Sequence, residues 1–452
     1  MSAAIENTED LRLARLQEIL DSGAMHSAQR LLKTLTPAEI AHLLESLPPA
    51  KREILWSLVD PAIEGEVLVN VSDEVQAELV KDMDADHWRA AAENLDLDDL
   101  TDLVQDMPET VVDEVLSALD DQRRHRVEAM LSYPEDTAGG LMNTDTVTVR
   151  PEVTLDVVLR YLRRLGEDMP PHTDALFVVN RDDEYLGVLP LWKLVSGNPD
   201  DTVAEVMSLN LKPLPVDMPA SEVARYFETH DVTSAPVVDE QGRPLGRITV
   251  DDVVDVIREE GEHQFMGQAG LSEEEDMFAP VLASTRRRAV WLGVNLLTAF
   301  LASWVIGLFQ DTLSKYVALA VLMPIVASMG GIAGSQTLTL AIRGIALGQL
   351  TGKNARHLLL KELAVGILNG IIWAVVVGAI AGIWFDDTRL AALIGVAIVI
   401  NLLFAAFTGA VLPLLLKRLG IDPALAGSVL LTTVTDVVGF FAFLGLASLF
   451  LA

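Results

Sequence analysis

Five long apolar stretches in the last part of the chain constrain its fold more than any other feature. Each is long enough, at about 20 residues per crossing, to span a lipid bilayer as an α-helix. The stretches are Ala289–Gln310, Tyr316–Ile342, Leu363–Phe385, Leu390–Leu416 and Leu425–Ala452. The sequence therefore predicts a multi-domain membrane protein in which residues 286–452 form an α-helical transmembrane bundle of five spans.

The charges are unevenly distributed along the chain. It carries 33 Lys and Arg against 65 Asp and Glu, a net charge of −32, although 50% of its residues are hydrophobic. Residues 286–452 hold 11 basic and 6 acidic residues, a net of +5, so residues 1–285 hold 22 and 59, a net of −37. Because phosphate binding needs a basic surface, we expect no nucleic-acid partner. The absence of cysteine excludes disulfides and thiolate metal sites.

The loops between the spans predict the orientation of the chain. With five spans, the loops rich in Lys and Arg all fall on one side, which the positive-inside rule places in the cytoplasm. The first ten residues, MSAAIENTED, contain no apolar region, so we expect no cleaved signal peptide. The acidic part is then cytoplasmic, and the C-terminus lies outside.

Asp436 lies within the fifth span, with apolar residues on both sides. A carboxylate at that depth is costly, so it normally faces a bundle interior or a wet path and has a partner. We favour a cation site, which Thr432 would join, because no Lys or Arg lies at comparable depth in any span. The alternative is a buried Asp that is hydrogen-bonded to the hydroxyls of Thr432, Thr433 or Thr435. Asn401, in the fourth span, is more typical of a helix–helix hydrogen bond.

The second span contains the segment PIVASMGGIAGSQ, which begins at Pro324. Pro324, Gly330 and Gly331 are poor helix formers, so the segment predicts a broken helix whose carbonyls line a cavity, with Gln336 adding an amide oxygen. A close-packing face of small residues is the alternative. Glu362, at the start of the third span, is expected to form an interfacial ion pair with Lys361.

These oxygen ligands favour a hard cation. Mg²⁺ keeps its waters, so one carboxylate among polar oxygens could hold a hydrated ion through its water shell. One carboxylate neutralises only half the charge of a divalent ion. We therefore expect a homodimer in which the two copies of Asp436 lie near the dimer axis.

Residues 1–133 predict an acidic, all-α domain of stacked helix pairs. LTPAEIAHLL at Leu35 is echoed 60 residues later by LDLDDLTDLV at Leu95, and such repetition is typical of superhelical arrays. Most of its acids are expected on solvated faces and at helix N-termini. Asp98 and Asp102 are the candidates for a weak divalent-cation site at an interface.

Residues 134–256 predict two copies of a β-α-β-β-α unit, with an offset of 59 that relates Val178 to Val237 and Gly187 to Gly246. The pair resembles tandem CBS domains. The segment from Ser132 to Met142 resembles the linker of MgtE-type magnesium channels, and PIVASMGGIAGSQ and DPALAGSVLLTTVTDVVG resemble their second and fifth spans. This resemblance covers the whole chain and implies a homodimeric Mg²⁺ channel in the cell membrane, the inner membrane of a bacterium.

Two departures from the family pattern affect the candidate sites. Ile332 stands where the family often has Asn, which removes an amide oxygen from the second span. CBS sites for adenosine phosphates commonly carry Gly-x-x-Thr/Ser-x-x-Asp. The second copy fits this pattern with Gly246, Thr249 and Asp252, which makes ATP a candidate ligand there, whereas the first copy does not. Alternatively, Thr249 and Asp252 only cap the following helix.

The resemblance makes residues 257–285 a connecting or plug region beneath the pore. The helix that leads into it starts at Asp251 with the sequence DDVVDVIREEGEHQFMG. Asp251, Asp252, Asp255 and Glu259 crowd this helix, and such like charges repel each other unless they share cations. We therefore expect cytoplasmic Mg²⁺ to bridge these carboxylates and close the channel.

Other functions are considered beside the Mg²⁺ channel. A secondary transporter could use Asp436 to couple an ion or a proton to an organic solute, or could carry another divalent ion such as Mn²⁺ or Co²⁺. A membrane-anchored sensor would not transport. An enzyme is disfavoured, because the chain shows no nucleophile–base constellation, phosphate-binding glycine loop or His-based metal site.

Overall fold

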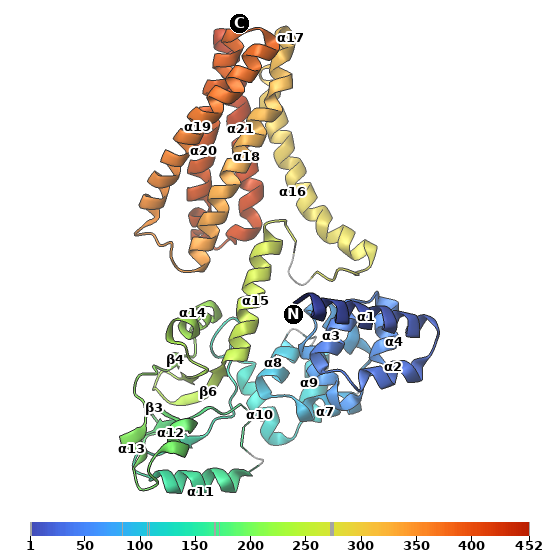
Figure 1. The fold of residues 1–452 in the computed structure, drawn as a ribbon, viewed down its shortest axis with the longest axis vertical. Helices are drawn as coiled ribbons and strands as arrows, with labels where there is room; N and C mark the ends of the chain where they lie inside the picture. Colours follow the sequence, from blue (N-terminus) through green and yellow to red (C-terminus); the bar gives the residue numbers. More distant parts are fainter. Residues whose placement is uncertain are drawn as a thin grey trace. The chain divides into compact units, whose positions relative to one another are not determined.

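The computed structural model of the chain describes residues 2–451 except residues 84, 106, 108, 167–168, 171 and 272–274 (Figure 1). The chain folds into two compact units. The first contains Met1–Glu260 and Glu274–Ala279, and the second contains Gly261–Glu273 and Pro280–Ala452.

The first unit begins with a helical domain, as the repeats predict. Thr36 shows how local sequence starts these helices, because its hydroxyl accepts from the Glu39 backbone while the Glu39 carboxylate caps the Thr36 N–H. The helices are α1 (Ser2–Asp21), α2 (Met25–Leu32), α3 (Pro37–Glu45), α4 (Pro49–Trp56), α5 (Glu64–Val69), α6 (Asp73–Leu79), α7 (Ala85–Asn94), α8 (Leu97–Gln105), α9 (Glu109–Ala118) and α10 (Asp121–Met130), with 3₁₀ turns η1 (Pro61–Ile63) and η2 (Val80–Asp82).

The 60-residue echo appears as two equivalent helix pairs. Helix α3 corresponds to α8, which begins 60 residues later, and α4 corresponds to α9 in the same way. The structure adds a second relation that the sequence analysis missed. Arg52 in α4 donates to the carbonyls of Leu44 and Leu47, and Arg124 in α10 donates in the same way to those of Leu116 and Leu119. In both cases an arginine of one helix satisfies carbonyls at and just beyond the end of the preceding helix.

The second part of the unit contains the two expected β-α-β-β-α copies. The first comprises β1 (Thr148–Val149), α11 (Leu155–Leu165), β2 (Ala175–Val179), β3 (Tyr185–Pro190), α12 (Leu191–Ser196) and α13 (Val203–Val206). The second comprises β4 (Leu214–Pro215), α14 (Ala220–His230), β5 (Ser234–Val238), β6 (Pro244–Thr249) and α15 (Val250–Gly267). In each sheet the first strand pairs in parallel with the second, which pairs antiparallel with the third.

The register of the two sheets confirms the repeat. Val178 lies opposite Gly187 and Val237 lies opposite Gly246, and each ladder shifts register directly after that pair. Each copy buries its own apolar core between its sheet and its helices. The connecting helix α15 follows β6 directly at Val250 and ends at Gly267.

The second unit holds the apolar helices. They are α16 (Val281–Gly307), α17 (Gln310–Lys315), α18 (Val317–Ala346), α19 (Ala355–Phe385), α20 (Thr388–Arg418) and α21 (Pro423–Phe450). All except α17 are long and apolar enough to cross a membrane, so five candidate spans are present among the described residues. Helix α20 packs against α18, α19 and α21 and is the most buried of the five.

The prediction of a broken second span is wrong. Helix α18 is continuous and contains Pro324 within its first turns. Its glycines serve close packing instead: a Cβ on Gly330 would lie 2.2 Å from the Asn401 side chain, and one on Gly334 would lie 2.9 Å from that of Leu431. The contacts with α20 and α21 hold the helix together, which the weak helical propensity of isolated glycine does not reveal.

Candidate cation site between two membrane helices

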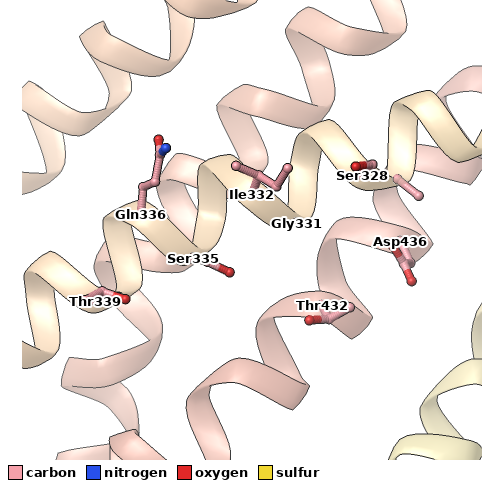
Figure 2. A pocket seen from close by; sticks show the side chains of 9 residues that line it. Ser328, Gly331, Ile332, Ser335, Gln336, Thr339, Thr432 and Asp436 are labelled. Atoms are coloured by element: carbon pink, nitrogen blue, oxygen red, sulfur yellow. The ribbon is translucent and has the colours of Figure 1, made fainter. Parts of the chain in front are cut away.

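A groove of about 710 Å³ lies between α18 and α21. From α18 it is lined by Ala327, Ser328, Gly331, Ile332, Ser335, Gln336 and Thr339, and from α21 by Thr432 and Asp436. Figure 2 shows Ser335, Thr432 and Asp436 turned toward the space between the two helices, whereas Gln336 and Ile332 project from another side of α18. Of the predicted site residues, Asp436, Thr432, Gly331 and Gln336 thus line the groove, with Gln336 at its margin.

Asp436 is half-buried and is the one carboxylate of the groove. The nearby threonine hydroxyls do not satisfy it: those of Thr432, Thr433 and Thr435 donate to helix carbonyls at 2.7–3.0 Å. The described residues give Asp436 no hydrogen bond or ion pair. The alternative in which threonines neutralise a merely structural Asp436 is thus not what the structure shows.

Three hydroxyl residues of α18 escaped the sequence analysis. Ser328, Ser335 and Thr339 line the groove, and they occur with Gly331 at helical spacings of three, four and seven residues. This periodic stripe of small and polar residues in an apolar helix was the available signal. The broken-helix interpretation obscured it, because a stripe exists only if the helix is continuous.

The size and lining of the groove suit a hydrated ion. Six waters occupy roughly 180 Å³ at about 30 Å³ each, so a hydrated Mg²⁺ fits within about 710 Å³. Hydroxyls and one carboxylate can accept hydrogen bonds from the waters of an ion that dehydrates reluctantly.

Gly330 does not line the groove. It is buried on the opposite side of α18, against Asn401. Asn401 donates to the Val326 carbonyl at 2.8 Å, so the expected helix–helix hydrogen bond is present. Gly331 has nothing within 4 Å of the position of a Cβ, which leaves its surface open to the groove.

A smaller cavity of about 190 Å³ lies beside the groove and shares Gln336 with it. Glu362 is 5% exposed there and contacts Lys361 at 2.6 Å, which confirms the expected ion pair. It also accepts from the Thr337 hydroxyl of α18 at 3.0 Å. Glu362 is thus satisfied by protein groups, in contrast to Asp436.

A second cluster of candidate residues lies in the first unit, where α8 approaches the start of α15. Asp98 is 7% exposed and accepts from the Asn143 amide at 3.0 Å. Burial, with repulsion from Asp252 and Asp99, raises the pKa of Asp98 well above its usual range. Burial likewise raises the pKa of Asp99 to about 7 and that of Asp252 to about 6.

The other members of this acidic cluster lie nearer to solvent. Asp102 keeps an exposed side chain, yet loss of surrounding water, with repulsion from Glu135 and Asp99, raises its pKa to about 8. Because solvent screens an exposed group, we give the buried Asp98 more weight. Asp251, Asp255 and Glu259 are exposed on α15, and Arg258 contacts Asp255 at 3.2 Å.

The described residues contain no group of three or more His, Asp or Glu side chains close enough to hold a metal ion directly. The carboxylates of the acidic cluster therefore repel one another but are not arranged to coordinate a metal ion directly. The cluster consists of Asp98, Asp99, Asp102 and the carboxylates of α15. Such an arrangement gains from any cation that reduces the repulsion, including a hydrated one.

The candidate nucleotide residues have structural partners. The Asp252 carboxylate accepts from the Thr249 backbone at 2.8 Å and from its hydroxyl at 2.9 Å, which is the helix-capping arrangement. A Cβ on Gly246 would lie 2.6 Å from the Asn143 carbonyl, so this glycine permits close strand packing. Both interpretations of the motif are compatible with this geometry, because a capping carboxylate can still face a ligand.

Comparisons with known proteins agree with this organisation. The family model of the MgtE intracellular N domain matches residues 35–136, that of the CBS domain matches residues 138–197 and 203–259, and that of a divalent cation transporter, MgtE, matches residues 323–446. The cytosolic domain of the Mg²⁺ channel MgtE, solved in complex with ATP, covers 54% of this chain and 99% of its own length, with a TM-score of 0.50 and 36% identity.

Two curated relatives match almost the whole chain. The magnesium transporter MgtE of Thermus thermophilus is 34% identical over 98% of this chain and 99% of its own length. That of Bacillus subtilis is 26% identical over 98% of both chains.

The fold and the family models together place the chain among multi-pass membrane transporters of divalent cations that carry a helical domain and a CBS pair in front of their spans. The chain belongs to the MgtE family of magnesium transporters.

Proposed function

We propose that this protein is a Mg²⁺-selective channel that mediates magnesium uptake through the groove between α18 and α21. The observation that carries the proposal is Asp436, a carboxylate with no hydrogen bond or ion pair among the described residues, which lines a groove of about 710 Å³ together with several hydroxyls. Its charge attracts the cation, while Ser335, Thr339 and Thr432 accept hydrogen bonds from the ion's waters. Because the described residues of the groove do not replace the ion's water ligands, the ion is held weakly enough to leave the groove.

Cytoplasmic Mg²⁺ closes this channel by binding the acidic cluster of the first unit. Raised pKa values at Asp98, Asp99 and Asp252 mean that the arrangement in which α8 approaches α15 disfavours ionised carboxylates. Mg²⁺ stabilises this arrangement by reducing the repulsion, and when Mg²⁺ is scarce the carboxylates separate. The ligand acts only through its tighter binding to the closed state.

The working assembly is a homodimer in the inner membrane of a bacterium, with the N-terminus cytoplasmic and the C-terminus outside. One groove offers a single carboxylate, and a second copy supplies the other charge that a divalent ion calls for. We assign residues 1–133 to the helical domain, 134–256 to the CBS pair, 257–285 to the connecting region and 286–452 to the pore. Chemical cross-linking in membranes checks the dimer.

ATP is the proposed second ligand, at Gly246, Thr249 and Asp252. The related cytosolic domain solved with ATP supports this assignment. Equilibrium dialysis with labelled ATP tests it: we expect binding that Thr249→Ala weakens and that Pro190→Ala, at the corresponding position of the first copy, leaves intact.

The test of the pore is Mg²⁺ flux into vesicles that contain the purified protein. We expect Asp436→Asn to lower the flux at least tenfold, because the amide has the same shape but no charge. Asp311→Asn, in the short helix α17 outside the groove, is the matched control and should retain the flux. Undiminished flux in Asp436→Asn would contradict the pore assignment. Flux that requires an organic solute would favour a secondary transporter, and parallel assays with Mn²⁺ and Co²⁺ measure selectivity.

The test of gating is the inhibition of that flux by Mg²⁺ on the cytoplasmic side. Replacing Asp251, Asp252 and Asp255 by Asn should leave the channel less inhibited, because three of the repelling charges are gone. The control replaces three exposed acids elsewhere in the CBS pair, Asp156, Asp200 and Asp217, and changes the net charge equally. Equal inhibition in the two triple variants contradicts the role of the cluster.

A further inference from the structure

Asn401 is fully buried in the middle of α20, among apolar side chains. Its amide nitrogen donates to the Val326 carbonyl of α18 at 2.8 Å. Its amide oxygen is buried and has no hydrogen-bond partner among the described residues. A buried polar group with one unused acceptor is costly, so a function beyond filling space should maintain it.

The Asn401 amide lies between two glycines that belong to two different helices. A Cβ on Gly330 of α18 would lie 2.2 Å from the amide nitrogen, and one on Gly439 of α21 would lie 2.7 Å from the same atom. Neither distance is compatible with a methyl group unless something moves. The backbones of α18 and α21 therefore both rest directly on this one side chain.

The same two helices form the groove, at the same level. Gly330 precedes Gly331, which lines the groove, and Gly439 follows Asp436 by three residues, less than one helical turn. Helix α20 contributes nothing to the lining, so Asn401 lies behind the groove. A change in its volume moves α18 or α21 and hence the separation between Asp436 and the hydroxyls of α18.

We propose that Asn401 is a positioning residue for ion selectivity: its amide sets the spacing of α18 and α21 at Gly330 and Gly439, and thereby the width of the groove at Asp436. The inference rests on the proposed function, because it takes the groove as the ion path. A groove of defined width discriminates among hydrated ions by size, and Mg²⁺ and Ca²⁺ differ in how firmly they hold their waters.

The experiment is a mutant cycle read out as Mg²⁺ and Ca²⁺ flux into vesicles. Gly330→Ala should lower Mg²⁺ flux at least tenfold, because the new methyl group displaces α18. Adding Asn401→Ala removes the amide from that position, and the double variant should recover at least threefold over Gly330→Ala. Asn401→Ala alone should change the ratio of Mg²⁺ to Ca²⁺ flux at least threefold, a readout that loss of stability alone does not move.

Two glycines provide the controls. Gly334 packs against Leu431 and not against Asn401, so Asn401→Ala should fail to rescue Gly334→Ala. Gly293, in α16, has nothing within 4 Å of a Cβ, so Gly293→Ala should transport like the wild type. If Gly330→Ala does not fold, Gly439→Ala replaces it in the cycle, because its methyl group meets the same amide.

Three outcomes would overturn the role of Asn401. Asn401→Ala could restore flux to both Gly330→Ala and Gly334→Ala, or to neither of them, or it could by itself leave the ratio of Mg²⁺ to Ca²⁺ flux unchanged. These outcomes differ from a failure of the proposed function, which shows as absent Mg²⁺ flux in the wild type or as full flux in Asp436→Asn. Either of the latter overturns both proposals.

Discussion

At the scale of the residue, Arg52 is a buried charge that connects several segments of the first unit. Its side chain is 1% exposed and contacts Glu78 at 2.7 Å and Asp276 at 2.8 Å, in addition to two backbone carbonyls. Asp276 is 5% exposed and lies shortly before α16, and its N–H donates to Glu74. The helical domain is thereby attached to the segment that leads into the first span.

Asp276→Ala should therefore destabilise the first unit. Removing one partner of a buried ion pair typically costs about 3 kcal/mol, because the remaining charge loses its compensation. We expect a melting temperature several degrees lower for the full chain in detergent. Arg12→Ala is the control, since Arg12 and Glu39 are each about 40% exposed and such surface pairs contribute about 1 kcal/mol or less. Equal effects of the two substitutions would contradict this account.

At the scale of the element, the ends of the membrane helices carry different side chains. Figure 1 shows α17 and the C-terminus at one end of the bundle, and α18 joins α19 at the other. At the α17 end, the Tyr316 hydroxyl donates to the Leu451 carbonyl at 2.5 Å and the rings of Trp384 and Phe385 stack. Aromatic side chains are typical of membrane interfaces, and the basic loop between α18 and α19 is typical of a cytoplasmic side.

Single cysteines test this orientation, and the cysteine-free chain needs no prior substitution. Ser314→Cys, in α17, should react with a membrane-impermeant maleimide applied to intact cells. Gly352→Cys, in the loop between α18 and α19, should react only after the membrane is opened. Both positions are exposed, so accessibility within the protein is matched. The reverse labelling pattern would show that the orientation is inverted.

At the scale of the whole molecule, the stability of the first unit depends on pH. The pKa values of Asp252, Asp99 and Asp102, about 6, 7 and 8, lie above the ordinary value of 3.8. The folded unit thus holds protons that the unfolded chain releases, so its free energy of unfolding falls as the pH rises from about 4 to 8. Under the proposed gating, Mg²⁺ competes with these protons for the same carboxylates.

We therefore expect Mg²⁺ to stabilise the full chain more at pH 8 than at pH 6. Without Mg²⁺ the melting temperature should be lower at pH 8, and saturating Mg²⁺ should raise it further there than at pH 6. The double variant Asp99→Asn, Asp252→Asn serves as the control, in which the difference between the two pH values should shrink. An equal Mg²⁺-induced shift at both pH values would be incompatible with this linkage.

Elements that depend on local pattern could be predicted from the sequence alone. Apolar length predicted five spans, the 59-residue repeat predicted two copies of a β-α-β-β-α unit, and Asp436 stood out because a lone carboxylate in an apolar helix is costly wherever it lies. Each of these signals is contained within one segment or in the comparison of two segments, so no knowledge of packing was needed.

Which residues face each other depends on how the helices pack in the folded chain. That packing made α18 continuous despite Pro324, it turned Gly330 toward Asn401 and Gly331 toward the groove, and it joined Arg52 to Asp276. Adjacent glycines have the same propensity, and partners 224 residues apart leave no local trace. Packing between helices distinguishes such residues, because it depends on the close approach of surfaces that lie far apart in the sequence.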